Sequence, residues 1–469
     1  MKKKIYFIII MLITCFALAA CGEEKTAEKV TDQYEMTPLI DQDGADPWVF
    51  RQDGMYYYTK RTGNTVTLFR SENLSDVASG ERMDVLEENS ELEQFWAPEL
   101  HKLDGVWYIY FAACTYDSDI HTMYVLSNEN EDPFEGEWAL SAMKGMDDKF
   151  AIDGTVLDAG GERYFIWSGW EGYENVQQNL YISRMVSPVE TRAEKVLISQ
   201  PDYEWEQNGT PLVNEGPQPI VIDGMVNLVY SASGSWTNDY CLGILTAEED
   251  SNLCDPSSWT KSEEPVLESG NDVYGPGHNC FATSPDGKDI YIIYHAARWD
   301  GAGWSRSVRM QPVNFGDDGV LDSLKPAESQ DTVPVPGGEP GRIRSLVKDL
   351  ELSGGVEKTE DETALSGCAV TGFDESRESA NWSVEVPENG LYMISVYAKI
   401  QNIVGEEDFA YAYIMANGSE NEIKMSPSAY YQPLSFRQEL DKGKNTISVS
   451  FEAMGGDVSL DRIELMPTG

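Results

Sequence analysis

Acidic and histidine side chains recur at similar distances before five turn glycines in the sequence. Each lies six to nine residues before its glycine, in a different stretch of the chain. Carboxyl groups that converge in a concave site raise one another's pKa values, and such groups are candidates for proton transfer and for activating water. The pairs are Asp46 and Gly54, Glu99 and Gly105, Asp153 and Gly161, Glu215 and Gly224, and His278 and Gly287.

Taken one at a time, these residues have simpler interpretations. Asp46, Asp153 and Glu215 each stand beside a proline or glycine, where an acid is more often a turn residue. His278 alone would more often be a hydrogen-bonded core histidine. The register shared by all of them favours a functional site instead, in which His278 would hold a metal ion or water.

The elements that must position these side chains form one recurring unit, a tight turn followed by an aromatic-rich strand. Successive turn glycines are 51, 56, 63 and 63 residues apart, and no segment shows a long helical period. Short strands repeated at this spacing predict an all-β fold, with a five-bladed β-propeller over residues 36–335. The first strand of each propeller blade lies around the central axis, so the acids that precede the turns would meet there.

Six ordered motifs carry a resemblance to glycoside hydrolase family 43, whose members are five-bladed propeller enzymes acting on arabinose and xylose linkages. The likeness covers nearly all of residues 40–320 and is greatest to the α-L-arabinofuranosidases of the family. The motifs are GADPWV at 44–49, WAPEL at 96–100, AIDGT at 151–155, WSGW at 167–170, NEGP at 214–217 and YGPGHN at 274–279.

The resemblance implies an inverting hydrolysis in which two carboxyl groups have different roles. Asp46 matches the general base that activates water, and Glu215 matches the general acid that protonates the leaving oxygen. Asp153 matches a third carboxylate that orients the acid and tunes its pKa. Inversion needs room for the water, so Asp46 and Glu215 should be roughly 6.5–9.5 Å apart. His278 matches a histidine near a central ion, commonly calcium, that is held largely through waters; no organic cofactor is implied.

Three further residues are candidates to contact the sugar. Trp96 and Trp170 match positions that shape the sugar pocket, with core packing as the competing interpretation. Arg309 is a looser match, and Arg306 competes with it for this role. The expected substrates are plant cell-wall polysaccharides or oligosaccharides such as arabinan and arabinoxylan.

Other functions remain open at this point. A β-xylosidase would use the same catalytic residues. A non-catalytic surface glycan-binding protein could share the fold, although all three acids are present. The fructan-cleaving propeller enzymes are less favoured, because their Arg-Asp-Pro and Glu-Cys motifs do not occur in this chain.

The N-terminus has the form of a bacterial lipoprotein signal. Three lysines at 2–4 precede a short apolar run over 5–18, and small residues then lead to Cys21. We expect residues 1–20 to be a signal peptide, Cys21 to be lipid-modified and 21–35 to be a tether. The enzyme would then be extracytoplasmic and anchored to the bacterial membrane or cell surface. The five later cysteines show no disulfide framework or zinc spacing.

A proline- and glycine-rich stretch at 334–340 marks a boundary, and alternating strands fill residues 343–469. They predict a β-sandwich of jelly-roll type that resembles family 6 and family 35 carbohydrate-binding modules. Trp382, Tyr430 and Tyr431 are candidate ligand-site aromatics, with a core position equally expected. This module would bind polysaccharide or support the propeller.

The charge of the chain limits its partners. Its 80 acidic and 34 basic residues give a formal net charge of −46. That charge argues against a nucleic-acid partner, which would need a basic surface, whereas it does not penalise a neutral sugar.

Overall fold

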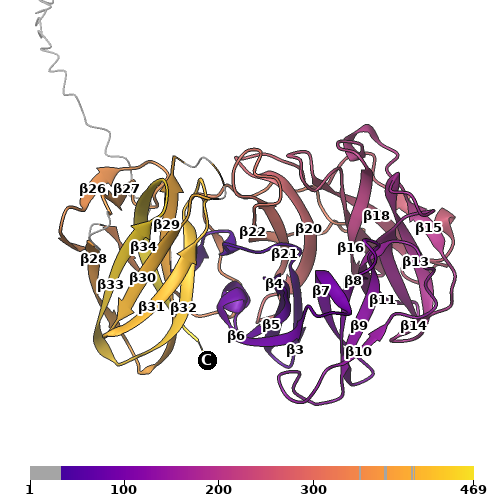
Figure 1. Cartoon of the computed structure of the whole chain (residues 1–469), viewed down its shortest axis with the longest axis horizontal. Helices are drawn as coiled ribbons and strands as arrows, with labels where there is room; N and C mark the ends of the chain where they lie inside the picture. Colours follow the sequence, from indigo (N-terminus) through magenta and orange to yellow (C-terminus); the bar gives the residue numbers. More distant parts are fainter. Residues whose placement is uncertain (1–32, 348–349, 374–377, 403–404, 406, 469) are drawn as a thin grey trace, which may run out of the picture. The chain divides into compact units, whose positions relative to one another are not determined.

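The computed structural model describes residues 33–347, 350–373, 378–402, 405 and 407–468, and strands dominate them (Figure 1). The expected signal peptide, Cys21 and most of the tether lie outside the described residues. The described ranges hold no α-helix, and their helical segments are short 3-10 helices: η1 (Leu74–Ser79), η2 (Glu204–Glu206) and η3 (Pro256–Ser258). No helix within them is both long and apolar enough to span a membrane. The all-β prediction is confirmed.

Five antiparallel meanders follow one another along residues 39–313. We number them one to five by chain order. Meander one contains β3 (Trp48–Gln52), β4 (Met55–Thr62), β5 (Thr65–Ser71) and β6 (Glu81–Glu87). Meander two contains β7 (Leu92–Leu103), β8 (Val106–Thr115), β9 (Thr122–Asn128) and β10 (Ala139–Ala142). Meander three contains β11 (Ala151–Ala159), β12 (Glu162–Gly169) and β13 (Gln177–Ser187), with β14 (Glu190–Thr191) and β15 (Val196–Ser199) paired to β13.

The last two meanders complete the series. Meander four contains β16 (Leu212–Ile222), β17 (Met225–Ala232), β18 (Cys241–Glu248) and β19 (Thr260–Lys261). Meander five contains β20 (Tyr274–Thr283), β21 (Ile290–Ala297) and β22 (Arg306–Val313), completed by the early strand β2 (Leu39–Asp41). Another early strand, β1 (Glu35–Met36), pairs with β23 (Val333–Pro334). Both ends of this region are therefore held by strand pairing.

The predicted tight turns join the first two strands of four meanders. Asp53 and Gly54 both have positive φ, 53° and 86°, between β3 and β4. Two consecutive residues of positive φ are typical of the type I′ hairpin, whose twist matches that of the strands. Gly287 also has a positive φ, but it lies in a longer connection between β20 and β21.

The first strands of the meanders lie against one another in a cycle. β3 contacts β7, β7 contacts β11, β11 contacts β16, β16 contacts β20, and β20 contacts β3. Apolar clusters fill the spaces between neighbouring meanders. The cluster that contains Tyr58 of β4 also contains Ile293 of β21, so the fifth meander packs on the first. This cycle brings residues that are far apart in the sequence to one place.

The polar residues predicted to meet interrupt the first strands locally. The β11–β12 register shifts between Ile152 and Thr155, around Asp153, and the β20–β21 register shifts between Gly277 and Cys280, around His278. Asp46, Asp153 and His278 all have positive φ. Bulges re-aim side chains and are common next to active sites, and strained φ values also concentrate at functional sites.

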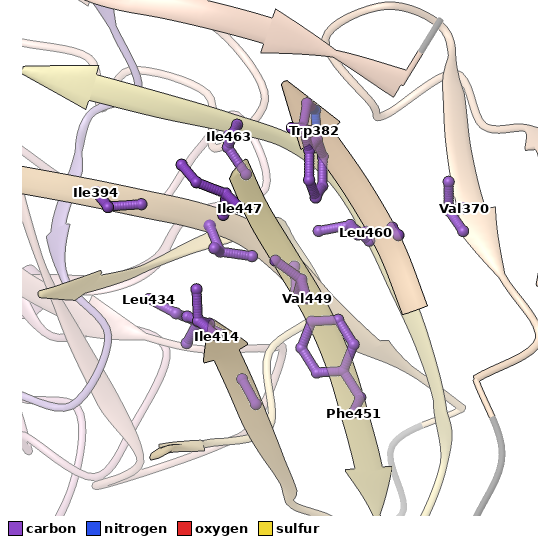
Figure 2. Packing of buried hydrophobic residues seen from close by; sticks show 14 of the residues in the cluster. Val370, Trp382, Ile394, Ile414, Leu434, Ile447, Val449, Phe451, Leu460 and Ile463 are labelled. Carbon is purple, nitrogen blue, oxygen red and sulfur yellow. The ribbon is translucent and has the colours of Figure 1, made fainter. Parts of the chain in front are cut away.

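The C-terminal strands form two sheets with one shared core (Figure 2). Side chains of both sheets, including Trp382, Val449, Ile394 and Ile463, belong to one buried apolar cluster. One sheet contains β24 (Ile343–Leu346), β26 (Glu357–Glu360), β27 (Cys368–Thr371), β29 (Gly390–Gln401), β32 (Gln432–Leu440) and β34 (Asp457–Pro467). The other contains β25 (Glu351–Ser353), β28 (Ser379–Val386), β30 (Ala410–Ala416), β31 (Ser419–Met425) and β33 (Gly443–Ala453).

Candidate active site

Asp46, His278, Glu215 and Asp153 lie together where the first strands meet. His278 Nδ1 is 3.2 Å from Asp46 Oδ1. Gly216, which follows Glu215, packs against the His278 ring, and its backbone N–H donates to Asp153 Oδ2 over 2.9 Å. The cycle of strands therefore brings together four residues that span 232 positions, from 46 to 278.

Gly216 makes this approach feasible in two ways. Its φ of +54° is one that other residues seldom adopt, and a Cβ there would come within 3.2 Å of His278 Cγ. The backbone can therefore turn Glu215 toward the site while its next N–H reaches Asp153.

Asp46 is surrounded by basic groups. His295 Nδ1 is 3.3 Å and Arg306 NH1 is 3.7 Å from Asp46 Oδ1, and the Asp46 backbone N–H donates to His295 Nδ1 over 3.0 Å. Burial by itself would raise the pKa of Asp46, but the positive charges of His278 and Arg306 outweigh burial and hold the pKa well below its usual range. Asp46 is therefore an ionised carboxylate at neutral pH.

The pKa values of Asp153 and Glu215 are raised, whereas that of Asp46 is lowered. The side chain of Asp153 is buried, and burial together with repulsion from Glu215 and Asp46 raises its pKa to about 7, against the attraction of His278. Burial also raises the pKa of Glu215, although His278 and a hydrogen bond from Tyr240 oppose it. Both carboxyl groups therefore keep their protons to higher pH than an exposed acid does.

His278 is the positive group among these acids. Burial lowers its pKa, but Asp46, Asp153 and Glu215 outweigh burial and raise the pKa above its usual value. Its backbone N–H donates to Ser231 Oγ over 2.7 Å, which fixes the strand at the bulge. A protonated His278 favours the ionised form of every carboxyl group near it.

Two contacts in the site escaped the sequence patterns. The Tyr240 hydroxyl donates to Glu215 Oε1 over 2.8 Å, and its ring is stacked on His295 with centroids 5.7 Å apart. Burial and the neighbouring Glu215 raise the pKa of Tyr240 well above its usual value, so the hydroxyl stays a donor. Burial and Arg306 lower the pKa of His295 to about 3, so this histidine stays neutral.

The structure does not bring Arg309 to the acids. Its side chain is fully buried and donates to Ser329 Oγ and Ala327 O, over 3.0 and 2.7 Å. Arg306 is the arginine of this strand that lies beside Asp46. Positions three apart on a strand point to opposite faces, so β22 can direct only one of these arginines to the site.

Trp96 and Trp170 belong to a partly buried aromatic row. Trp96 is stacked on His121 with centroids 3.5 Å apart, and Trp170 is stacked on Phe150 at 4.5 Å. His121 and Phe150 are themselves 6.2 Å apart, edge to face. Both tryptophans therefore pack on the core cluster between meanders two and three and keep part of their surface exposed.

Glu99 faces different partners from those of the other acids. Its carboxylate accepts a hydrogen bond from Gln218 and lies 3.0 Å from His101 Nε2. Glu99 is buried, and these two neighbours supply the polar contacts that a buried carboxylate needs. Its carboxylate is therefore not bonded to the group around Asp46.

The donor set does not favour a directly bound calcium ion beside His278. Ca²⁺ takes roughly six to eight oxygen ligands. Among residues 33–468 that the structure describes, no group of three or more His, Cys, Asp or Glu side chains is arranged to hold a metal ion. The His278 nitrogen faces Asp46, and the acids nearby are engaged with protein donors.

The arrangement can perform general acid–base chemistry. It contains Asp46, whose carboxyl group has a lowered pKa, and the buried carboxyl groups of Asp153 and Glu215, whose pKa values are raised. Titratable groups whose pKa values are pushed apart by their surroundings supply a base and an acid in one site.

Comparisons with known proteins agree with this chemistry. A family model described as "Glycosyl hydrolases family 43" matches residues 36–321. An extracellular exo-α-(1→5)-L-arabinofuranosidase of Streptomyces chartreusis is 35% identical over 274 residues, which are 56% of this chain and 82% of that enzyme. An α-L-arabinofuranosidase of Humicola insolens is 33% identical over 327 residues, covering 66% of each chain.

A solved structure shows the same likeness. The crystal structure of an α-L-arabinofuranosidase from Lactobacillus brevis has a TM-score of 0.60 and 33% identity to this chain. The match covers 64% of this chain and 99% of that protein. The family model, over residues 36–321, covers the part of the chain that holds the five meanders.

Proposed function

The chain belongs to glycosyl hydrolase family 43 and is a glycosidase, and we propose that it releases L-arabinofuranose from arabinan or arabinose-substituted plant polysaccharides and oligosaccharides. The observation that carries this proposal is the convergence of Asp46, Asp153 and Glu215 around His278, where their surroundings lower the pKa of Asp46 and raise those of the other two. The arabinofuranosidase relatives support the choice of sugar.

The proposed reaction is a single displacement with inversion. Asp46 takes a proton from a water molecule as that water attacks the anomeric carbon, and Glu215 gives a proton to the departing glycosidic oxygen. Burial raises the pKa of Glu215, and Asp153 accepts the Gly216 backbone N–H and so holds the backbone beside the acid. Arg306 and His278 stabilise the charged Asp46 before the proton arrives. The carboxyl groups of Asp46 and Glu215 should leave room for the water between them.

Two substitutions test this proposal. Asp46→Ala and Glu215→Gln should each lower kcat on an aryl α-L-arabinofuranoside by roughly 10²–10⁴-fold, because each removes one proton-transfer step. Glu204→Gln, at an exposed acid of η2, is the control and should keep wild-type turnover. Near-normal turnover in either site variant would refute the assignment.

The alternatives give different results in the same assays. A β-xylosidase of this fold would cleave an aryl β-xyloside in preference to the arabinofuranoside. A non-catalytic glycan-binding protein would bind arabinan and hydrolyse neither substrate. The sequence identity to arabinofuranosidases favours arabinofuranose release over β-xylosidase activity and over glycan binding without hydrolysis.

We also propose that residues 36–335 form a five-bladed β-propeller, with a β-sandwich of jelly-roll type over 343–469. The cycle of first strands and the packing of meander five on meander one support the propeller. The single apolar cluster shared by two sheets supports the sandwich. Family membership supports the propeller independently.

The sandwich has the features of a supporting module. Trp382, Tyr430 and Tyr431, the candidate ligand-site aromatics, are all buried. The Tyr430 hydroxyl donates to Ala297 O at the end of β21, over 3.2 Å. Binding of glycan in the manner of family 6 or family 35 modules would need other residues, and retardation of residues 343–469 by arabinan or xylan in affinity electrophoresis would reveal it.

A lipid anchor at Cys21 completes the proposal. The lysine, apolar and small-residue order of positions 2–21 supports an extracytoplasmic enzyme tethered to the bacterial membrane or cell surface. The S. chartreusis relative is itself described as extracellular. Mass analysis of the mature N-terminus should find a lipid-modified Cys21, and an unmodified first residue beyond it would exclude the anchor.

A further inference from the structure

Two tryptophans are exposed side by side near the acids. Trp236 is 36% exposed and Trp304 is 68% exposed, and the other tryptophans of the described residues are less exposed. Their ring centroids are 6.2 Å apart with an angle of 73° between the rings. Large apolar rings at the surface of a soluble protein mark binding sites when they are clustered.

The two rings are held by loops that are bonded to each other. Trp236 belongs to loop 233–240, between β17 and β18, and Trp304 belongs to loop 298–305, between β21 and β22. Trp304 Nε1 donates to Ser235 Oγ over 3.2 Å, and the Gly301 backbone N–H donates to Asn238 Oδ1 over 3.1 Å. The position of the pair is therefore fixed before any ligand arrives, which lowers the entropic cost of binding.

Trp236 is also supported from its own loop. A Cβ at Gly234 would come within 2.7 Å of its indole ring, so the loop backbone lies directly against the ring. Only a residue without a side chain permits this contact. The ring of Trp236 is thus pre-positioned by packing, and Trp304 is pre-positioned by its hydrogen bond.

The same loops lead into the catalytic group. Loop 233–240 ends at Tyr240, whose hydroxyl donates to Glu215 Oε1. Arg306, which follows loop 298–305, donates to Ser235 O over 2.7 Å and lies 3.7 Å from Asp46. Exposure rises outward, from 10% for the Arg306 side chain to 68% for Trp304. The pair therefore lies at the surface, and loop 233–240, which carries Trp236, joins it to the residue that contacts the proposed acid.

The chemistry of Trp236 and Trp304 indicates which kind of ligand they would bind. An indole ring offers a flat apolar face to the C–H groups of a sugar ring, and a polar N–H at its edge. The loops supply hydroxyl and amide groups and the acids Asp239 and Asp300. Their one basic residue, Arg298, is buried and paired with Asp43, and Arg306 is already engaged with Asp46 and Ser235. A neutral sugar suits this surface, and an anionic one would be repelled.

We propose that Trp236 and Trp304 form a subsite for the neutral sugar unit on the leaving-group side of the bond that is cleaved. This inference rests on the proposed arabinofuranosidase function. Glu215 is the proposed donor to the leaving oxygen, so the leaving sugar must depart past the loop that holds Tyr240 and Trp236. The subsite would contribute binding for chains of two or more sugar units and little for a small leaving group.

The test compares two substrates in one variant. Trp304→Ala should lower the ratio of kcat/KM for α-1,5-linked arabinotriose to kcat/KM for methyl α-L-arabinofuranoside by about tenfold, a loss typical of truncating an aromatic contact at a binding site. Trp304→Phe keeps a flat ring and should recover most of the ratio. Leu197→Ala, at an exposed apolar residue of β15, is the control and should leave the ratio within about twofold of wild type.

Each outcome has one meaning. An unchanged ratio in Trp304→Ala would overturn the subsite. An equal loss on both substrates would also overturn it, because the ring would then act through the catalytic groups. If the wild-type enzyme cleaves neither arabinoside, the proposed function fails, and the subsite fails with it.

Discussion

Tyr240 is the residue that most directly controls the proposed acid. Its hydroxyl donates to Glu215 Oε1 and thereby lowers the pKa of that carboxyl group, against the larger effect of burial. Tyr240→Phe should therefore raise the pKa of Glu215 further. The alkaline limb of the kcat/KM profile reports loss of the acid's proton, so this limb should move to higher pH. One buried hydrogen bond is worth about 1 kcal/mol, so kcat should fall about fivefold.

A buried tyrosine outside the site provides the control for this measurement. The Tyr110 hydroxyl donates to Pro188 O over 2.6 Å, and its ring lies between meanders two and three. Tyr110→Phe should lose a similar hydrogen bond and keep the wild-type pH profile. An alkaline limb that stays in place, or moves to lower pH, in Tyr240→Phe would contradict the role given to Tyr240.

The site residues that could be predicted from the sequence all lie at similar distances before the turn glycines. Asp46, Asp153, Glu215 and His278 could be predicted together because each lies eight or nine residues before a turn glycine. Tyr240 and His295 could not, because they lie after the turns, in a loop and in a second strand. The choice between Arg306 and Arg309 needed the strand register, which decides the face of β22 on which each residue lies.

Gly277 of β20 lies directly against the Tyr240 ring. A Cβ at Gly277 would come within 2.1 Å of Tyr240 Cε1. Gly277→Ala should therefore push the ring away from Glu215 and lower kcat at least as far as Tyr240→Phe does. Overpacking of this kind costs roughly 1–3 kcal/mol of stability, which denaturant unfolding can measure.

Gly270→Ala is the matched variant, because a Cβ there meets nothing within 4 Å. It should keep both kcat and stability close to wild type. Wild-type kcat in Gly277→Ala would show that the Tyr240 ring can shift without consequence, which contradicts the packing argument.

The strands were predictable because their alternation and their turns are local properties. The Asp-Gly turns at 53–54 and 104–105 have the positive φ values that these dipeptides favour. The shifts of register at Asp153 and His278 were not predictable, because a bulge depends on the partner strand and on the space beside it. Those shifts aim the functional side chains, so the site's geometry needed the folded structure.

Ion pairs connect the C-terminal sheets to meander one within the compact unit of residues 31–469. Arg437 of β32 donates to Ser71 Oγ over 2.8 Å and to Asp76 Oδ2 over 3.2 Å. Asp76 is 2% exposed, so removing Arg437 would leave a buried carboxyl group with only the Ser71 hydroxyl and the charge of Arg342 to stabilise it. Arg437→Met should therefore lower the free energy of unfolding by about 3–5 kcal/mol.

An exposed ion pair gives the comparison for Arg437. The side chains of Arg82 and Asp84 are 47% and 58% exposed, at 2.8 Å. Arg82→Met should cost less than about 1 kcal/mol, because water screens exposed pairs. Equal unfolding free energies for the two variants would show that the C-terminal sheets do not stabilise meander one through this contact.

The most direct test of inversion by Asp46 as base and Glu215 as acid is the order in which the product anomers appear. Proton NMR of an α-L-arabinofuranoside during hydrolysis by the wild-type enzyme distinguishes the first-formed arabinose anomer from the one that appears later by mutarotation. A water activated by Asp46 opposite a leaving group protonated by Glu215 predicts that β-L-arabinose forms first. First formation of the α-anomer would mean that configuration is retained, and would contradict the assignment of Asp46 as the base.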